Sequence, residues 1–303
     1  MKIKIKTQPL VSVIMNCYNG EKYLEESIQS VISQTYDNWE LIFWDNRSED
    51  KSSEIFKKYQ DKRFKYFYAN KHTSLYEARN LAIQKSTGDF ISFLDTDDLW
   101  EKQKLEKQMD YFDDHSIGVV YSNYWLAKKD LRKKKINFRK RLYRGDVYNE
   151  LINNYNIGIL TAIIRKKNYE ELKKKFDERF SIIGDFDLFL RLSKLCKFES
   201  IQTPLAYYRL HGKNLSTIYK GKEIDELTIW LRENEASLNK FNVKRIKKNI
   251  CHRKFVNSKI DGNYKGCINI LLNSGLNLLN LKNLIIFLLP VAILKKLLWY
   301  HQD

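Results

Sequence analysis

The chain has 303 residues and a formal net charge of +17, from 54 Lys and Arg against 37 Asp and Glu. That length can bury one large domain, or one domain with an appendage, and the charge favours anionic partners such as nucleic acid, acidic lipid or phosphorylated substrates. The four cysteines are widely scattered, which excludes a dense disulfide framework and a paired zinc motif and predicts reduced thiols in a cytoplasmic protein.

The N-terminal segment MKIKIKTQPL lacks a continuous apolar stretch, so we expect no signal peptide. Beyond it, short apolar runs alternate with helical spacing, which is typical of βα units and a mainly parallel sheet. We expect strands at 11–15, 39–44, 64–69, 90–94 and 117–126, and helices at 21–34, 52–60, 75–86 and 101–112.

The second half of the chain is less regular. We expect a strand at 159–165, an amphipathic helix at 184–195, an extended segment at 198–210 and helices from 218 onward. This change of pattern predicts a boundary near residue 217.

An apolar run covers residues 284–294 and contains Pro290. It is too short to span a bilayer. Lysines and Trp299 flank it, so it suits a helix that lies in a membrane interface. A core helix of the C-terminal segment is equally consistent with the pattern.

The turn after the first expected strand reads NCYNGEKY and holds one glycine. It therefore lacks the G-x-G-x-x-G cradle of a dinucleotide-binding dehydrogenase, and no Walker A sequence is present. A phosphate-containing ligand needs another means of offsetting its charge.

An acid cluster, Asp95, Asp97 and Asp98, ends the apolar run FISFL. In an extended segment Asp95 and Asp97 point to the same side, because side chains alternate with period two. Carboxylates placed in this way suit Mg²⁺ or Mn²⁺, which can bridge a nucleotide diphosphate. Capping of the following helix is the alternative role, and one acid can cap while another binds the metal.

The chain resembles family 2 glycosyltransferases with the GT-A fold over roughly residues 10–217. The motifs that carry this resemblance stand in the same order and rough spacing: VSVIMNCYNGEKYLEESIQSVISQTYDNWELIFWDNRSED, EARNLAI, TGDFISFLDTDDLW, GDFDLFLRL and YYRLHGKNLS. The resemblance implies an α/β fold with a Rossmann-like mixed sheet flanked by helices. It also implies a donor-binding half at about 10–125 and an acceptor-side half at about 126–217. A helical C-terminal extension, 218–303, follows.

The resemblance also implies residues that hold the nucleotide-sugar donor: Asn16, Tyr18, Asn19, Asp45, Asn46, Arg79, Asp95 and Thr96. The family commonly has a second aspartate where Asn46 stands, and an asparagine carbonyl can still accept a hydrogen bond from uracil N3–H. Ser74 stands where the family usually has a glycine before the arginine.

The same resemblance makes Asp97 and His211 metal ligands, with Asp98 beside them, for Mn²⁺ or Mg²⁺. It makes Asp185 the general base, in a pair that usually reads Glu-Asp and here reads Gly184-Asp185. We expect Asp187 to be structural and to pair with Arg191 at i+4.

The predicted function is an inverting, metal-dependent hexosyltransferase that moves a sugar, most simply from a UDP-sugar, to a hydroxyl of a glycan or lipid-linked saccharide. This activity would serve bacterial cell-surface polysaccharide synthesis. The protein would be cytoplasmic and contact the anionic inner membrane peripherally through Lys- and Arg-rich surfaces. The alternatives are a sugar-phosphate nucleotidyltransferase and a basic nucleic-acid-binding protein. The basic run 128–144 has few interleaved aromatic residues, which disfavours nucleic acid. The oligomeric state is not predicted.

Overall fold

We describe a computed structural model of the chain over residues 8–128, 131–212, 214–215, 219, 221–273 and 278–298. The chain divides into two compact units, Met1–Leu210 and His211–Asp303. The division falls at the end of the last strand, a few residues before the boundary expected near 217.

The first unit alternates strands and helices through most of its length. In chain order these are β1 (Val11–Cys17), α1 (Glu21–Ile32), β2 (Trp39–Asp45), α2 (Ser52–Lys57), β3 (Phe64–Tyr68), α3 (Leu75–Gln84), β4 (Phe90–Phe93), β5 (Leu99–Trp100), α4 (Lys104–Met109), β6 (Ile117–Lys128), β7 (Lys134–Ile136), α5 (Tyr148–Asn153), β8 (Ile163–Arg165), α6 (Lys166–Glu171), α7 (Gly184–Leu192) and β9 (Lys197–Leu210). Short 3₁₀ helices cover Asp110–Asp113 and Ile159–Thr161.

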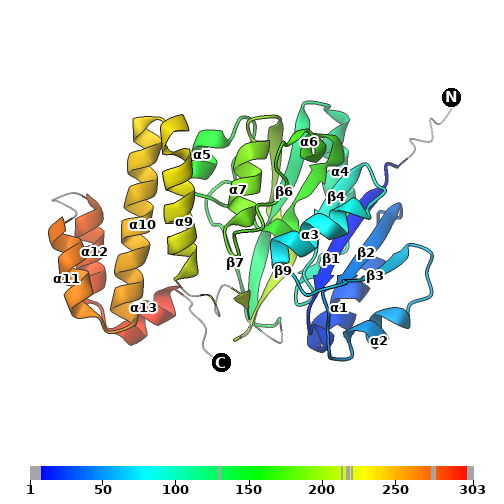
Figure 1. Cartoon of the computed structure of the whole chain (residues 1–303), viewed down its shortest axis with the longest axis horizontal. Helices are drawn as coiled ribbons and strands as arrows, with labels where there is room; N and C mark the ends of the chain where they lie inside the picture. The colour runs from blue at the N-terminus through cyan, green and yellow to red at the C-terminus, as the bar shows by residue number, and fades with distance from the viewer. Residues whose placement is uncertain are drawn as a thin grey trace. The chain divides into compact units, whose positions relative to one another are not determined.

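The strands form one mixed sheet in the order β3-β2-β1-β4-β8-β6-β9-β5, with β7 paired to β6 (Figure 1). Strands β3, β2, β1 and β4 are parallel, whereas β8 is antiparallel to both β4 and β6. The strand order reverses at β1, which lies between β2 and β4. In open α/β sheets, ligands bind beyond the carboxyl ends of the strands at such a reversal.

The parallel strands form the centre of the core. β1, β2 and β4 are buried along almost their whole length, as expected for parallel strands covered on both faces. Helix α1 contributes Leu24, Ile28 and Val31 to the same cluster. These side chains are the apolar positions at helical spacing from which the helix was predicted.

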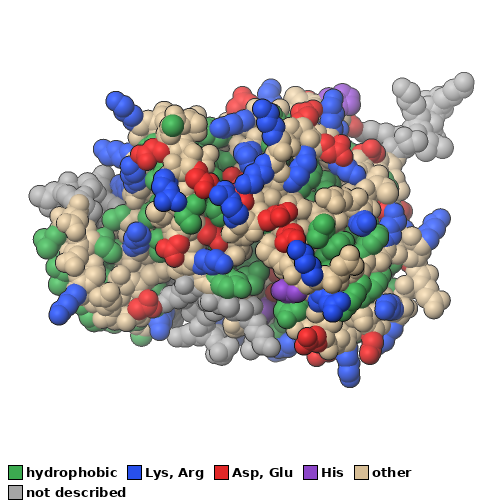
Figure 2. Space-filling model, in the orientation of Figure 1, with side chains coloured by type: hydrophobic (Ala, Val, Ile, Leu, Met, Phe, Trp, Pro, Cys, Tyr) green, Lys and Arg blue, Asp and Glu red, His purple; other side chains and the backbone are tan. Residues whose placement is uncertain are grey.

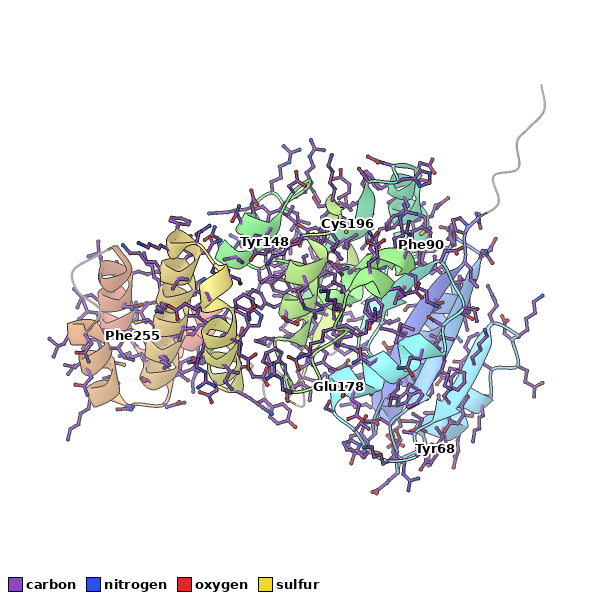
Figure 3. All side chains as sticks on the ribbon, turned by 45° about the horizontal axis from the view of Figure 1, so that its top comes forward. Tyr68, Phe90, Tyr148, Glu178, Cys196 and Phe255 are labelled. Atoms are coloured by element: carbon purple, nitrogen blue, oxygen red, sulfur yellow. The ribbon has the colours of Figure 1, made fainter. Side chains whose placement is uncertain are left out.

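The second unit consists mainly of helices over its described residues. It contains α9 (Lys222–Asn234), α10 (Lys240–Ile260), α11 (Tyr264–Asn273), α12 (Leu278–Leu288) and α13 (Val291–Leu298). Its core includes Phe255, which is fully buried among these helices, with Cys267, Ile286 and Leu294 (Figure 3).

The apolar run 284–294 is split into α12 and α13, with Pro290 between them. Ile286 and Leu294 belong to the core of the second unit. Other apolar side chains of the run are exposed: Leu284, Ile285, Leu288 and Ile293. The run therefore contains both core and exposed apolar surface. Among the described helices, none is long and apolar enough to cross a bilayer.

Basic side chains are spread widely over the face drawn in Figure 2, with acidic side chains between them. The net charge is thus not gathered into one patch on that face. Charged side chains spread in this way are typical of solvated surface.

The strands expected at 11–15, 39–44, 64–69, 90–94 and 117–126 are present to within two residues at each end. The helix expected at 101–112 begins only at Lys104, because Leu99 and Trp100 form β5 and pair with β9. Only the end of the strand expected at 159–165 is extended, since Ile159–Thr161 is a 3₁₀ helix. The sequence did not predict β7, α5 or α6.

Candidate active site

The candidate site lies at the carboxyl ends of β1, β2 and β4. The register places Cys17, at the end of β1, opposite Asp45 at the end of β2. The Asn46 amide donates to the Cys17 carbonyl (2.8 Å), so the two strand ends remain together beyond the sheet. Asp95 follows β4, which pairs with β1 on its other side.

The end of β1 presents side chains suited to a nucleoside. The Nδ2 atom of Asn16 is buried and makes no hydrogen bond to a described residue. Tyr18 is 53% exposed, and its ring lies 4.3 Å, centroid to centroid, from the ring of His72. An exposed aromatic pair beside a buried amide is suited to stacking and hydrogen bonding with a base.

Asn19 joins the loops that follow β1 and β2. Its backbone has a positive φ of 54°, a conformation that asparagine tolerates better than most residues. Its Oδ1 accepts from the Glu49 amide (2.8 Å), and its own amide donates to Ser48 Oγ (3.1 Å). These contacts indicate that Asn19 shapes the loop.

Asp45 and Asn46 are also engaged with the protein. Asp45 is fully buried and accepts from the Ser48 amide and from the Tyr66 hydroxyl, both at 2.7 Å. The Asn46 amide group donates to the Thr73 carbonyl (2.9 Å) and accepts from the Thr73 amide (3.2 Å). The backbone carbonyl oxygen of Asn46 lies 2.9 Å from His72 Nδ1. Asn46 therefore holds the loop that places His72 beside Tyr18.

Arg79 and Asp95 form an ion pair within the site. Nη2 of Arg79 lies 2.8 Å from Oδ1 and 3.1 Å from Oδ2 of Asp95. The arginine side chain is 3% exposed and the aspartate side chain 32%. Arg79 is also within electrostatic range of Asp185. One buried cation therefore connects the acid cluster with the predicted base.

The turn Asp95-Thr96-Asp97-Asp98 is held by α1. Ser27 Oγ bonds to the carbonyls of Thr96 (2.8 Å) and Asp98 (2.7 Å). Gly20, the single glycine of NCYNGEKY, faces this turn, since a Cβ there would lie 2.7 Å from Thr96 Oγ1. The glycine thus permits the close approach of the loop after β1 to the acid cluster.

Arg209 of β9 fixes the other side of the same turn. Its amide donates to Asp98 Oδ1 (2.9 Å), its Nε donates to the Asp97 carbonyl (3.0 Å), and its Nη2 pairs with Glu26 (2.7 Å). Burial, and then the neighbouring Asp97 and Asp95 carboxylates, raise the pKa of Asp98. Asp98 is therefore buried and bonded within the turn, whereas Asp97 is only half-buried.

The predicted base, Asp185, lies in the first turn of α7. Oδ1 accepts from the Phe186 amide (2.8 Å), and Oδ2 accepts from the Tyr155 hydroxyl (3.2 Å). Burial raises the pKa of Asp185 to about 6, although these two donors and Arg79 lower it. A carboxylate with this pKa is ionised at neutral pH and basic enough to take a proton.

Tyr76 explains why glycine precedes the base. A Cβ on Gly184 would lie 2.5 Å from Cε2 and 2.6 Å from Cζ of the Tyr76 ring. The tyrosine therefore fills the space that a side chain at 184 would need. Ser74, at the other departure from the family pattern, caps α3 by accepting from the Glu77 amide (3.3 Å) in an extended conformation. That conformation does not require glycine.

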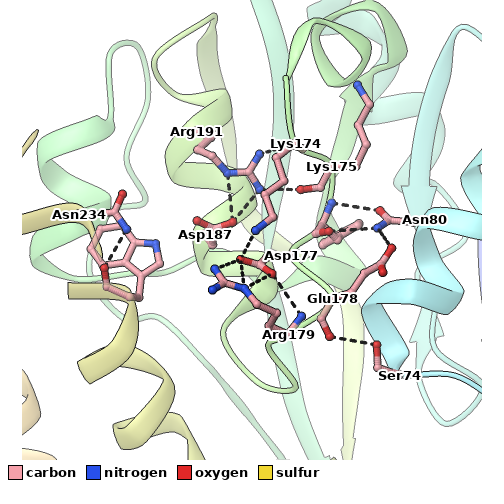
Figure 4. A network of polar contacts seen from close by, with 12 residues as sticks. Ser74, Asn80, Lys174, Lys175, Asp177, Glu178, Arg179, Asp187, Arg191 and Asn234 are labelled. Carbon is pink, nitrogen blue, oxygen red and sulfur yellow. Dashed lines mark hydrogen bonds and ion pairs between the residues drawn. The ribbon is translucent and has the colours of Figure 1, made fainter. Parts of the chain in front are cut away.

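The segment before α7 is tied to α3 and to the base helix (Figure 4). Asn80 bonds to both backbone groups of Phe176, each at 3.0 Å, and Arg191 donates to the carbonyls of Lys174 and Lys175. The expected pair of Asp187 and Arg191 is present at 2.7 Å. The prediction of this structural ion pair is confirmed.

The described residues contain no group of three His, Cys, Asp or Glu arranged to hold a metal. This donor set still fits Mg²⁺ or Mn²⁺, because such ions are commonly held by one or two carboxylates together with substrate phosphates. Asp97 is a half-buried carboxylate of the same turn and would take that role, and Asp95 is paired with Arg79. His211 begins the second unit, so the structure does not place it relative to Asp97.

The structure thus brings together Asn16, Tyr18, Asp45, Arg79 and the acid turn at one sheet edge, with Arg79 linking to Asp185. Sequence reasoning missed His72, Tyr155 and Arg209. Arg209 stands in the quoted motif YYRLHGKNLS, so it could have been singled out there. No local signal marked the other two.

Two solved structures share this fold. Staphylococcus aureus TarS 1–349 in complex with UDP-GlcNAc has a TM-score of 0.66 and 20% identity, covering 86% of this chain and 79% of that one. The mannosyltransferase PcManGT from Pyrobaculum calidifontis, with GDP-Man and Mn²⁺, has a TM-score of 0.63 and 14% identity, covering 98% of this chain and 89% of that one. The mixed sheet with acids at its carboxyl edge is that of a glycosyltransferase with the GT-A fold.

The chain belongs to glycosyl transferase family 2, whose family model matches residues 12–181. A curated relative is the Escherichia coli UDP-Glc:alpha-D-GlcNAc-diphosphoundecaprenol beta-1,3-glucosyltransferase WfgD. It is 32% identical over 210 residues, which cover 69% of this chain and 80% of the relative. The resemblance on which the sequence analysis relied is therefore confirmed.

Proposed function

We propose that the protein is an inverting, metal-dependent hexosyltransferase that uses a UDP-sugar and a lipid-linked saccharide in cell-surface polysaccharide synthesis. The observation that carries this proposal is the position of Arg79, which is paired with Asp95 of the acid turn and within electrostatic range of Asp185. The proposed donor and base sites are thereby joined through one buried side chain.

In the proposed reaction Asp185 takes the proton of an acceptor hydroxyl. The hydroxyl oxygen forms a bond to the anomeric carbon while the bond from that carbon to the diphosphate breaks. The electron pair leaves with the diphosphate, and attack from the opposite side inverts the anomeric centre. A bound Mn²⁺ or Mg²⁺ would neutralise charge on the diphosphate. Asp97 would hold it, with His211 and Asp98 as further proposed ligands.

Donor binding is assigned to the end of β1 and to the loops beside it. Tyr18 and Asn16 are free to meet a base there, since one is exposed and the amide of the other has no described partner. Asn19, Asp45 and Asn46 would support this site from behind through their contacts with the loops. WfgD is named for UDP-Glc and PcManGT was solved with GDP-Man, so the fold by itself accommodates either base.

The acceptor is assigned to a diphosphate-linked saccharide because WfgD is named for one. The β6–β7 hairpin offers a basic surface for it. In the antiparallel register, Lys135 and Asn137 lie on the same face as Tyr124, whose hydroxyl is in electrostatic range of Asp185. Burial, and then Arg139 beside it, lower the pKa of Lys135.

The proposed organisation has two parts, a catalytic domain at 1–217 and a helical segment at 218–303. The helical segment would contact the cytoplasmic face of the membrane peripherally. Exposed apolar side chains on α12 and α13 lie among lysines, the arrangement of a helix at a membrane surface. An acceptor carried by a lipid would then be met at the bilayer.

The alternatives receive less support. A sugar-phosphate nucleotidyltransferase would need a glycine-rich basic signature where NCYNGEKY stands. A nucleic-acid-binding protein would favour a continuous basic patch with aromatic side chains, and the face in Figure 2 shows basic residues dispersed among acids.

A donor screen tests the proposal. UDP-glucose, UDP-GlcNAc and GDP-mannose, each with Mn²⁺ or Mg²⁺, are scored by thermal stabilisation and by release of the nucleotide diphosphate. Each combination of donor and metal ion that gives a signal is then tested with GlcNAc-diphosphoundecaprenol as the acceptor. We expect stabilisation by a UDP-sugar and transfer to the lipid-linked acceptor. Stabilisation by none of these donors would contradict the proposal.

A further inference from the structure

The carboxylate of Asp185 is held in one orientation by two donors from different parts of the chain. The Phe186 amide bonds to Oδ1 within α7, and the Tyr155 hydroxyl reaches Oδ2 from the loop after α5. Each carboxylate oxygen has two lone-pair positions, so neither of these donors by itself fills the oxygen that it contacts.

Tyr155 is itself fixed. Its ring packs edge-on against Phe186, with centroids 5.6 Å apart and planes at 86°. Burial, and next the Asp185 carboxylate, raise the pKa of Tyr155 far above its usual value, so the hydroxyl stays protonated and can only donate to the carboxylate. Tyr155 thus remains a neutral hydrogen-bond donor to Oδ2 of Asp185, while Asp185 would gain and lose a proton during the proposed reaction.

Helix α7 is fixed from the other side by Tyr76. Its hydroxyl accepts from the Asp185 amide (3.3 Å) and donates to the Ile182 carbonyl (3.1 Å), while its ring covers Gly184. The titratable and charged groups that face Asp185 are therefore Tyr76 and Arg79 from α3, Tyr124 from β6 and Tyr155. Of these four, Tyr155 is the one for which a side-chain hydrogen bond donated to the carboxylate is described, at 3.2 Å.

We infer that Tyr155 is the positioning residue for the general base, holding the Asp185 carboxylate toward the acceptor and keeping it ionised near neutral pH. This inference rests on the proposed role of Asp185. Removing the hydroxyl would raise the pKa of Asp185, because a hydrogen bond to the ionised form favours that form. It would also release one of the two constraints on the carboxylate.

The test compares Tyr155→Phe with Tyr121→Phe in the full chain. Tyr121 is a buried tyrosine of β6 whose hydroxyl donates to the Tyr143 carbonyl (2.8 Å), so its variant also loses a buried hydrogen bond. Carbon-13 NMR of aspartate carboxyls, assigned with Asp185→Asn, follows the titration of Asp185 without any ligand. We expect its pKa to rise by about half to one unit in Tyr155→Phe and to stay in place in Tyr121→Phe.

The second readout is turnover of UDP-glucose with Mn²⁺ between pH 5 and 9. We expect the acid limb of kcat to move up by the same amount, with a several-fold lower plateau and an unchanged donor KM. An unmoved Asp185 titration in Tyr155→Phe overturns the inference. If Tyr155→Phe does not fold, the Asp185 titration is measured in Tyr155→Met, which also lacks the hydroxyl, and an unmoved titration there overturns the inference in the same way. A shifted titration in a protein that turns over no nucleotide sugar contradicts the proposed function instead.

Discussion

Nη2 of the buried Arg79 lies 2.8 Å from Oδ1 and 3.1 Å from Oδ2 of Asp95, so a single nitrogen contacts both carboxylate oxygens. The pair is asymmetric, because the arginine is almost inaccessible while the aspartate is one-third exposed. Loss of the aspartate charge leaves a cation in the interior. Loss of the arginine leaves an acid that water can still reach.

We therefore expect Asp95→Asn to lower the free energy of unfolding by about 3 kcal/mol, the lower part of the range for breaking a buried ion pair. Chemical denaturation measures the loss. Asp61→Asn is the matched control, because Asp61 pairs with Arg63 where both side chains are about one-third exposed, and its loss should cost about 1 kcal/mol or less. Equal costs in the two variants would contradict the description of Arg79 as a buried cation.

Asp185→Asn should reduce kcat by about 10²- to 10⁴-fold and leave donor binding almost unchanged, because it removes a proton acceptor and keeps the shape. The wild-type activity should fall below pH 6, since the pKa of Asp185 is about 6 and only its ionised form can act as a base. Steady-state kinetics across pH measures both effects. Asp187→Asn breaks the pair with Arg191, and we expect that variant to keep the acid limb.

Asp97→Asn should abolish transfer without unfolding the protein, because Asp97 is half-buried and would hold the metal. EDTA should have the same effect on the wild type, and added Mn²⁺ should restore only the wild type. The exposed Asp110 provides the control substitution. Full transfer in EDTA would remove the metal from the proposal and leave the acid cluster a structural turn.

Gly184→Ala should destabilise the protein by about 1–3 kcal/mol, because its Cβ would meet the Tyr76 ring at 2.5 Å in a packed interior. Combining it with Tyr76→Ala should cost less than the sum of the two changes, by about 0.5–3 kcal/mol. Thermal and chemical unfolding supply the double-mutant cycle. Gly212→Ala is the control, since its Cβ would meet nothing within 4 Å. Additive costs would show that the ring and the glycine are not coupled.

The pair Ile285→Ser and Leu288→Ser should release the protein from liposomes that contain acidic lipid, because both side chains are more than half exposed. High salt should weaken wild-type binding as well. Co-sedimentation measures both. Point substitutions are preferable to removal of the tail, since Ile286 and Leu294 belong to the core of the second unit. Leu195→Ser, at an exposed leucine of the first unit, should bind as the wild type does.

The sequence predicted the elements that local pattern determines. Buried parallel strands read as continuous apolar runs, so β1, β2 and β4 were found, and the acids after β4 were expected at its carboxyl end. The short strand β5 has only two residues, too few for any periodicity, and it exists because β9 pairs with it.

Partners distant in sequence could not be predicted. Arg209 contacts Asp98 across 111 residues, and Tyr155 contacts Asp185 across 30, without a local pattern that selects either pair. Asn46 shows the same limit. Its side-chain amide is bonded to Thr73, 27 residues away, which only the fold brings beside it, and its contact with a uracil stays a prediction.

The contacts of Arg209 with the acid turn also determine where the connection to the second unit leaves the first unit. Arg209 is the penultimate residue of that unit, and the backbone passes through Leu210 into the second unit at His211. The tether is thus attached beside the turn that would hold the metal and the diphosphate. A pull exerted through the linker, for example when the second unit adheres to a surface, would reach Arg209 through two peptide bonds, and Asp97 and Asp98 through the hydrogen bonds that Arg209 makes to them. Arg209 would then both carry mechanical load from the linker and position the proposed metal-binding turn.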